Sequence, residues 1–328
     1  MPRVTESDVL VIGAGMAGLV AARELVAAGY SVRVVDKGRG TGGRLATRRS
    51  GAATFDHGAQ FLLAHEPRFA AALEAWRSAG ILEPWGMAEA ASGGVRWRGA
   101  PSMTAIAKHL ARDLDVLLGR RVIALRRAAA GWKADCEDGT AVAAGAIVIT
   151  APVPQALELL AASAIDLPAA QSRALGTLDY EPCLVGMVVL DGPSRVPPPG
   201  YIALEVGPLA WIADNHQKGI SAVPALTLHA TPAFSRAHWD DAREACGRQL
   251  VEAASPWLGS PVLECVVHAW RYARPLRRAE RPFVVVDNDP PLLMAGDAFG
   301  GPDAEGAAMS GWAVARALQQ LFAELRDR

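Results

Sequence analysis

The chain has almost no excess charge. Its 328 residues include 33 Lys and Arg and 34 Asp and Glu, which gives a formal net charge of -1. Nucleic-acid-binding proteins neutralise phosphates with a positive surface, so this balance argues against that class. The cysteines form no C-x-x-C pair and have no metal-ligand spacing with histidine, so we predict no metal site. We expect them to be reduced core residues of an intracellular protein: Cys136, Cys183, Cys246 and Cys265.

The sequence also lacks a long apolar run. The stretch VLVIGAGMAGLVAARELV follows Asp8 rather than a basic segment and is interrupted by Arg23 and Glu24, which is unlike a signal peptide. No run of about 18 apolar residues occurs, so we predict no transmembrane helix, no membrane partner and a cytoplasmic location. Lysine is scarce, with four residues at positions 37, 108, 133 and 218.

What the sequence does contain is a strand–helix–strand pattern at its start. Residues 8–12 (DVLVI) form an apolar run that stops at glycine, apolar positions recur at helical spacing over 15–28, and 31–36 (SVRVVD) is the next strand. This order predicts an α/β fold with a parallel sheet. Further helices are expected at 68–80, at 102–114, after 152 and from about 306, and further strands at 121–127, 132–136, 144–150, 183–190, 203–206 and 291–297.

The motif GAGMAG lies at the first strand–helix junction. Gly13 permits a tight turn, Gly15 lets the backbone approach a pyrophosphate, and Gly18 allows close helix–strand packing. Asp36, at the end of the second strand, is placed to accept a ribose diol. The alternative is that the glycines only punctuate a turn. The predicted contacts with a dinucleotide in this region are Gly13, Gly15, Met16, Ala17, Gly18, Asp36 and Lys37.

A second glycine-rich stretch, DKGRGTGGRL, follows directly. Gly43 allows unusual backbone angles and Arg44 is suited to pair with a phosphate. The stretch resembles the Gly-Gly-Arg element of the two-dinucleotide-binding flavoproteins, the class that includes monoamine oxidases and protoporphyrinogen oxidases. This resemblance implies FAD rather than NAD as the resident cofactor.

The C-terminal stretch AGDAFGGPDAEGAAMSG fits the same class. By that resemblance, Gly296 and Asp297 hold the ribityl chain, and a helix that begins near Glu305, Gly306 and Ala307 directs its dipole at the flavin. Val122, on the strand RVIAL, is the matching position for seating adenine. The alternative is an ordinary capped surface helix. No cysteine follows Cys265, so we expect the FAD to be bound non-covalently.

Several longer blocks resemble the renalase family, and this similarity covers nearly the whole chain. The blocks are FDHGAQFLLAHEPRFAAALEAW, RWRGAPSMTAIAKHLA, LHATPAFS, HAWRYARP and AGDAFGG followed by EGAAMSG. The resemblance implies an FAD-dependent oxidase of the 2- and 6-dihydro isomers of NAD(P)H, with hydride transfer to flavin N5 and reoxidation by O2 to give NAD(P)+ and hydrogen peroxide. Phe61 departs from the family, where a tyrosine is expected.

Such a reaction needs no general base, because loss of hydride from a dihydropyridine gives an aromatic pyridinium directly. The sequence shows no convincing acid–base pair. Flavin amine oxidases usually keep a lysine near flavin N5, and Lys218 lies in NHQKG, which is typical of a loop. This counts against amine oxidation. Two alternatives stay open: a flavin oxidase or desaturase of an amine or other small substrate, and a non-catalytic dinucleotide-binding protein.

Each substrate-side residue has both a functional and a structural interpretation. Gly58, Ala59 and Gln60 are predicted beside the flavin edge, with Gln60 available to substrate or flavin, although an ordinary loop is the alternative. His229 and Trp270 are predicted to face the pocket, with structural roles in the core as equal alternatives. An arginine run between 271 and 281 would meet a pyrophosphate or simply be solvated.

We therefore predict a discontinuous Rossmann-type FAD domain and a mixed-sheet substrate domain, in a p-hydroxybenzoate hydroxylase-like topology. The FAD domain is expected at 1–62, 103–160 and 270–328, and the substrate domain at 63–102 and 161–269. The preferred isomer, the choice between NAD and NADP forms and the oligomeric state are left open by the sequence.

Overall fold

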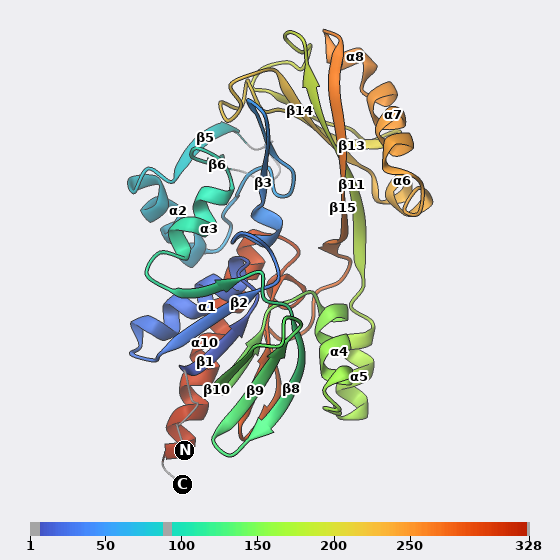
Figure 1. Cartoon of the computed structure of the whole chain (residues 1–328). Coiled ribbons are helices and arrows are strands. Elements are labelled where there is room, and N and C mark those ends of the chain that lie inside the picture. Colours follow the sequence, from blue (N-terminus) through green and yellow to red (C-terminus); the bar gives the residue numbers. More distant parts are fainter. Residues whose placement is uncertain (1–6, 88–93, 327–328) are drawn as a thin grey trace. The chain divides into compact units, whose positions relative to one another are not determined.

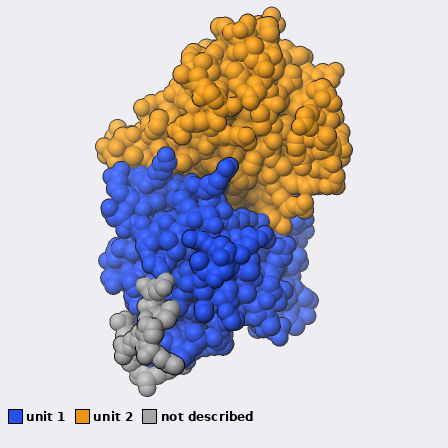
Figure 2. Space-filling view, in the orientation of Figure 1, with its two compact units in different colours: residues 1–43, 107–179, 275–328 blue, residues 44–106, 180–274 orange. Residues whose placement is uncertain are grey.

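The computed structural model describes residues 7–87 and 94–326. The chain forms two compact units from alternating segments, drawn in two colours in Figure 2. Unit 1 comprises Met1–Gly43, Ala107–Asp179 and Pro275–Arg328, and unit 2 comprises Arg44–Ile106 and Tyr180–Arg274. The predicted alternation is therefore present with other boundaries: 44–62, 103–106 and 270–274 belong to unit 2, and 161–179 belongs to unit 1.

Unit 1 is an α/β layer built on a mainly parallel sheet. β1 (Ser7–Ile12) pairs in parallel with β2 (Val32–Asp36) and with β10 (Ala141–Ile149). β7 (Asp115–Leu118) extends the sheet beyond β2, and β17 (Pro291–Met294) and β16 (Val284–Asn288) extend it beyond β10. β8 (Val122–Ala128) and β9 (Gly131–Cys136) add an antiparallel ribbon to β10. The predicted α/β class is confirmed.

Helices cover this sheet, and the pairing of α1 (Met16–Ala27) with α10 (Ala304–Arg326) is the closest (Figure 1). A Cβ at Gly311 would lie 2.4 Å from the backbone oxygen of Ala17, so glycine lets the two helices touch through their backbones. The remaining helices of the unit are α3 (Thr104–Leu110, which enters from unit 2), α4 (Val153–Ala162), α5 (Ala169–Gly176) and the short α9 (Asp297–Gly300). Gln171 of α5 donates to the backbone of Val285 (2.9 Å), which explains why 161–179 belongs to unit 1.

Unit 2 is built on a five-stranded sheet in the order β12-β13-β14-β11-β15. These strands are β11 (Tyr180–Leu190), β12 (Tyr201–Ala203), β13 (Leu209–Asp214), β14 (Ala225–Ala230) and β15 (Val262–Pro275). Along one face lie α6 (Pro232–Ala237), α7 (Arg243–Ala253) and α8 (Ser255–Leu258), as Figure 1 shows. The predicted strand 203–206 is wrong beyond Ala203, because the chain turns there with Gly207 at a φ of +97°.

The other face of this sheet receives the segment that follows the 3-10 turn Gly43–Leu45. β3 (Thr47–Ser50) and β4 (Ala53–Asp56) form a hairpin, and Phe55 is buried in a cluster with Met187 and Ala225. This packing places 44–62 in unit 2 rather than in the predicted FAD domain. α2 (Pro67–Ser78) and the β5 (Leu82–Met87)–β6 (Val95–Gly99) pair complete the unit. Over the described residues, no helix is both long and apolar enough to cross a membrane.

Candidate flavin site

Gly13 and Gly18 shape the loop between β1 and α1. Gly13 has a φ of +116°, and a Cβ there would lie 2.5 Å from Thr150 Oγ1. A Cβ at Gly18 would lie 1.9 Å from the backbone oxygen of Gly13, so only glycine lets α1 approach the strand end so closely. The packing of unit 1 therefore requires these two glycines, whatever the loop binds.

Gly15 has the opposite environment. A Cβ there would meet no atom within 4 Å, and its backbone angles (φ -84°, ψ -174°) suit any residue. Packing does not explain a glycine at this position, whereas a pyrophosphate in contact with the backbone would. Gly15 is also the N-cap of α1, no side chain caps that helix, and its first turn has no acidic residue. The N–H groups and positive dipole of α1 thus fit the pyrophosphate of a dinucleotide.

Asp36 and the second glycine-rich stretch join this loop. The Asp36 carboxylate accepts hydrogen bonds from the N–H groups of Ala14 (2.7 Å) and Gly38 (2.6 Å). Its remaining lone pairs are available for the predicted ribose contact. The Gly42 N–H donates to the Ala14 oxygen (2.8 Å), and the Cβ position of Gly43 lies 3.7 Å from the Gly15 Cα. The two glycine-rich stretches therefore lie side by side, as a shared cofactor site requires.

The C-terminal glycines are held by contacts within unit 1. Gly296, at a φ of +145°, donates its N–H to Ser310 Oγ (2.8 Å). The Gly306 N–H donates to Asp303 Oδ1 (2.8 Å), and a Cβ at Gly306 would lie 2.3 Å from the Gly301 oxygen. α10 is therefore capped, as the alternative interpretation expected, but residues 305–308 are buried rather than on the surface. These small residues are needed for backbone packing, in addition to any room that they leave for a flavin ring.

The other residues predicted to hold FAD in unit 1 are distributed around this loop. Met16 and Ala17 are the first residues of α1, and both are buried. Lys37 is exposed, with Nζ 3.3 Å from Gln155 Oε1, and Val122 is the first residue of β8. Asp297, the first residue of α9, is buried, as are Glu305 and Ala307 in the first turns of α10. Their contacts with FAD stay a prediction.

Four predicted cofactor residues belong to unit 2, namely Arg44, Gly58, Ala59 and Gln60. The Arg44 guanidinium donates from Nη1 to the backbone oxygens of Tyr272 and Ala273, both at 3.3 Å. The Arg44 guanidinium is thus partly engaged by the backbone of β15, and its pairing with a phosphate stays a prediction. Ala59 donates its N–H to the Arg44 oxygen (2.8 Å), and a Cβ at Gly58 would lie 2.0 Å from that oxygen. Close packing against Arg44 explains the glycine at 58.

Gln60 is buried and its amide is used within unit 2. Nε2 donates to the backbone oxygens of Asp56 (2.5 Å) and Gly58 (3.3 Å), which takes up both amide hydrogens. The expectation that Gln60 presents this group to a ligand therefore needs correction, because the amide nitrogen closes the turn that carries it.

His229 and Trp270 meet on His57, which the sequence analysis did not single out. Trp270 Nε1 donates to the His57 oxygen (2.8 Å), and His229 Nε2 lies 3.4 Å from the same oxygen. The His57 ring stacks on Trp270, with centroids 5.2 Å apart, and meets His268 edge-on at 4.7 Å. Two of the predicted substrate-side residues thus converge on one short segment.

Burial keeps His57 and His229 neutral at pH 7. It lowers the pKa of His57 to about 3, with His268 as a further cause, and it lowers the pKa of His229 to about 4. The pKa of His268 is lowered by the same cause. A general base works best when its pKa lies near the operating pH. Neither His57 nor His229 meets that condition at neutral pH.

The burial of Lys218 was not predicted from the sequence. This lysine lies in the expected turn after β13, yet its side chain is completely buried. Nζ is 2.9 Å from Asp56 Oδ2, 3.3 Å from Gln60 Oε1 and 4.5 Å from the centre of the Trp85 ring. Burial lowers the pKa of Lys218, and Asp56 opposes that shift. The rarity of lysine in an arginine-rich chain was the signal available for it.

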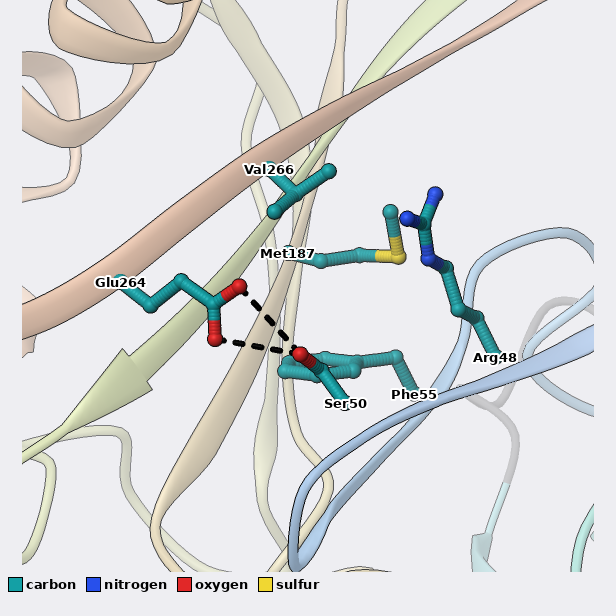
Figure 3. A pocket seen from close by; sticks show the side chains of 6 residues that line it. All are labelled: Arg48, Ser50, Phe55, Met187, Glu264 and Val266. Carbon is teal, nitrogen blue, oxygen red and sulfur yellow. Dashed lines mark hydrogen bonds between the residues drawn. The ribbon is translucent and has the colours of Figure 1, made fainter.

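Two of the hollows in the described part of unit 2 are lined by residues named above. The one in Figure 3 encloses about 10 Å³, which is room for about one water molecule. Ser50 donates to both carboxylate oxygens of Glu264 there, at 3.3 and 3.1 Å, beside the Phe55 ring. The other is an open depression of about 450 Å³ bordered by Trp85, Arg98 and residues 198–199 and 217–219. Neither is lined by the histidine cluster.

Comparison with known proteins decides the family. Residues 85–319, more than half of the chain, match the model for flavin-containing amine oxidoreductases, and residues 11–76 match an NAD(P)-binding Rossmann-like domain. The chain belongs to the flavin-containing amine oxidoreductase family. It is an FAD-dependent oxidoreductase, and the predictions of enzyme class and cofactor are confirmed. The narrower resemblance to renalases is not shown by these matches.

Solved structures agree on the fold. A protein of Exiguobacterium sp. 255-15 assigned as a protoporphyrinogen oxidase matches 97% of this chain and 100% of its own, with a TM-score of 0.73 and 12% identity. Wild-type putrescine oxidase bound to putrescine matches 96% of this chain and 99% of its own, with a TM-score of 0.72 and 14% identity. At these identities the likeness establishes the flavoprotein oxidoreductase fold, not the substrate.

Proposed function

We propose that this member of the family oxidises the 2- and 6-dihydro isomers of NAD(P)H. The observation that carries the proposal is the burial of two histidines of unit 2, which lowers the pKa of His57 to about 3 and that of His229 to about 4 and keeps both neutral. A dihydropyridine becomes aromatic by losing a hydride alone, so its oxidation needs no base with a pKa near 7. The resemblance of the sequence blocks to renalases supports the same substrate class.

In this proposal each unit has a separate task. Gly15 and the N-terminus of α1 bind the pyrophosphate of FAD, Asp36 binds its ribose, and Asp297 binds its ribityl chain. When bound, FAD supplies hydride acceptance and the return of two electrons to O2. In unit 2, the half-buried indole of Trp270, which stacks on the buried His57, is the flat apolar surface against which a nicotinamide ring would be oriented.

A second candidate, a flavin amine oxidase, is favoured by the buried Lys218. The sequence argument against it was that this lysine lies in a loop, and the buried side chain removes much of that argument. The family model also covers enzymes of this kind. The two candidates differ in their substrates: a cationic amine for one, a dihydronicotinamide dinucleotide for the other.

The test is anaerobic mixing of the FAD-loaded protein with each dihydro-NAD(P) isomer, with loss of the flavin absorption band followed in time. NADPH and a panel of amines that includes putrescine are run beside them. Rapid bleaching by one isomer, with none by the amines, is expected. Bleaching by amines alone would transfer the protein to the second candidate. Bleaching by none of them would refute both candidates and leave an oxidoreductase of another small substrate.

A further inference from the structure

Lys218 and Asp56 form an ion pair in which both side chains are completely buried. Both oxygens of the Asp56 carboxylate are hydrogen-bonded: Oδ2 accepts from Lys218, and Oδ1 accepts from Thr47 Oγ1 (2.6 Å) and from the Met103 N–H (3.1 Å). Burying two charges is costly, and the cost is offset only where geometry and further hydrogen bonds are good. The third hydrogen-bond partner of Lys218 indicates a role for this pair beyond general stabilisation.

That third partner is the Gln60 amide, which has one orientation compatible with its neighbours. The ammonium of Lys218 can only donate, so it must face Gln60 Oε1, at 3.3 Å. The carbonyls of Asp56 and Gly58 can only accept, so they must face Nε2. A flipped amide would place the Nε2 donors against the ammonium of Lys218 and the Oε1 acceptor against the two carbonyl oxygens. Lys218 and the two carbonyls thus favour the same orientation, and Lys218 is the one side chain among them that holds Oε1.

The turn depends on this closure because its backbone has few other bonds. In segment 56–60, the His57 N–H donates to the Ala46 oxygen at 3.3 Å, and the Ala59 N–H donates to the Arg44 oxygen. The segment forms no sheet ladder beyond Asp56. Its carbonyl groups are held by side chains instead: Gln60 and Thr227 bond the Asp56 oxygen, Gln60 bonds the Gly58 oxygen, and Trp270 and His229 contact the His57 oxygen. Loss of the Gln60 orientation would therefore loosen the segment on both sides of His57, the residue that stacks on Trp270.

We propose that Lys218 is a positioning residue, which fixes the Gln60 amide and through it the conformation of segment 56–60. The positioning role stands on the contacts of unit 2 alone. Its consequence for turnover rests on the proposed function, since that function assigns the ring stack on this segment to the substrate.

The first test needs no substrate. The side-chain amides of glutamine are labelled with 15N in the FAD-loaded protein, and the Gln60→Glu variant identifies the Gln60 signal by its loss. We expect the Gln60 amide hydrogens to exchange with water at least 100-fold more slowly than those of an exposed glutamine. In Lys218→Met the exchange should become at least tenfold faster, whereas the exposed Lys133→Met control should change nothing.

Lys218→Met leaves Asp56 buried without its cation, which destabilises the fold. Two further variants therefore separate the loss of Gln60 positioning from unfolding. Lys218→Arg keeps the charge and the donors and should restore slow exchange. The double variant Lys218→Met with Asp56→Asn removes both charges and should fold with a rapidly exchanging Gln60 amide. A folded Lys218→Met or double variant in which the Gln60 amide stays as protected as in the wild type would overturn the proposal.

The second test measures the bleaching rate with whichever substrate reduces the flavin. Lys218→Met should lower it by about ten- to one hundredfold, the range expected for a hydrogen bond to a charged group. The same substitution in a Gln60→Ala background should have no further effect, because both act through one amide. Additive losses would contradict the positioning role. If no dihydro-NAD(P) isomer bleaches the flavin, the proposed function fails while the exchange measurement still decides the role of Lys218.

Discussion

Adding a methyl group to Gly18 and to Gly15, two glycines of one motif, is expected to affect different properties: the stability of the fold in one case and the affinity for FAD in the other. Gly18→Ala places a Cβ 1.9 Å from the backbone oxygen of Gly13, where neither atom can move without shifting β1 or α1. Gly15→Ala places a Cβ in open space, at backbone angles that alanine adopts freely. The first substitution therefore tests the fold, and the second tests the predicted approach of a pyrophosphate.

The magnitudes follow from these environments. Overpacking a close backbone contact costs about 1–3 kcal/mol, and the 1.9 Å approach places Gly18→Ala at or above the upper end. At Gly15, the lower entropy of the unfolded alanine chain favours folding by about 0.4–1 kcal/mol, and the loss of a glycine N-cap offsets a similar amount. The stability of the protein without FAD should thus change by less than about 1 kcal/mol in Gly15→Ala. Its FAD dissociation constant should rise at least tenfold, because the methyl group keeps the pyrophosphate from the helix N–H groups.

The assay is urea unfolding of both variants and the wild type after removal of FAD, followed by titration with FAD. Urea midpoints report the fold, and flavin fluorescence during the titration reports the affinity. The expected pattern is a lower midpoint for Gly18→Ala alone and, at Gly15, weaker FAD binding with an unchanged midpoint. Full FAD affinity in Gly15→Ala would refute the placement of the pyrophosphate, since no protein contact is available to explain that glycine.

Four further outcomes are expected. In folded protein His57 and His229 have pKa values of about 3 and about 4, below the unfolded value of 6.5, so the unfolded chain binds more protons as pH falls below 6.5. The free energy of unfolding should therefore fall toward pH 4 by about 1.4 kcal/mol per pH unit for each group, and the double His→Gln variant should flatten this slope in urea titrations. Gly311→Ala should lower the thermal midpoint, by the equivalent of about 1–3 kcal/mol, since its Cβ would lie 2.4 Å from the Ala17 oxygen. Trp270→Phe keeps an aromatic ring against His57 but loses the indole N–H donor. The rate of flavin bleaching should therefore fall, while the melting temperature should change little. Burial raises the pKa of Cys183 to about 12, so this thiol should not react with a disulfide reagent at pH 8 until the protein unfolds.

Most of unit 1 could be predicted because its signals are local. The run 8–12, the glycine after it and the acid at 36 lie within one strand–helix–strand unit, and each residue type has a direct physical reason in that geometry. β1, α1 and β2 accordingly lie within two residues of the predicted bounds. The glycine at 18 was assigned to close packing, and the structure gives that contact directly.

Unit 2 was less predictable because its candidate site is made by long-range contacts. Lys218 and Asp56 are 162 positions apart, and Trp270 is 213 positions from His57. No periodicity or spacing records such a contact, so a buried lysine in a turn was indistinguishable from an exposed one. The domain boundary differs for the same reason: 44–62 follows the flavin motifs in sequence, but Ala53 and Phe55 within it are buried against residues of β11 and β14.

The buried lysine and the neutral histidines favour different chemistries, and the ion pair offers a way to weigh them. A lysine that accepts and releases a proton during amine oxidation would spend part of the cycle neutral. Asp56, completely buried beside it, would then be an unpaired charge, and breaking a buried pair in this way costs about 3–5 kcal/mol. A lysine that only holds an amide in place keeps its proton throughout and incurs no such cost. The contacts of Lys218 are thus better suited to positioning than to proton transfer, and a reaction that moves a hydride without a proton is the one that leaves this pair undisturbed.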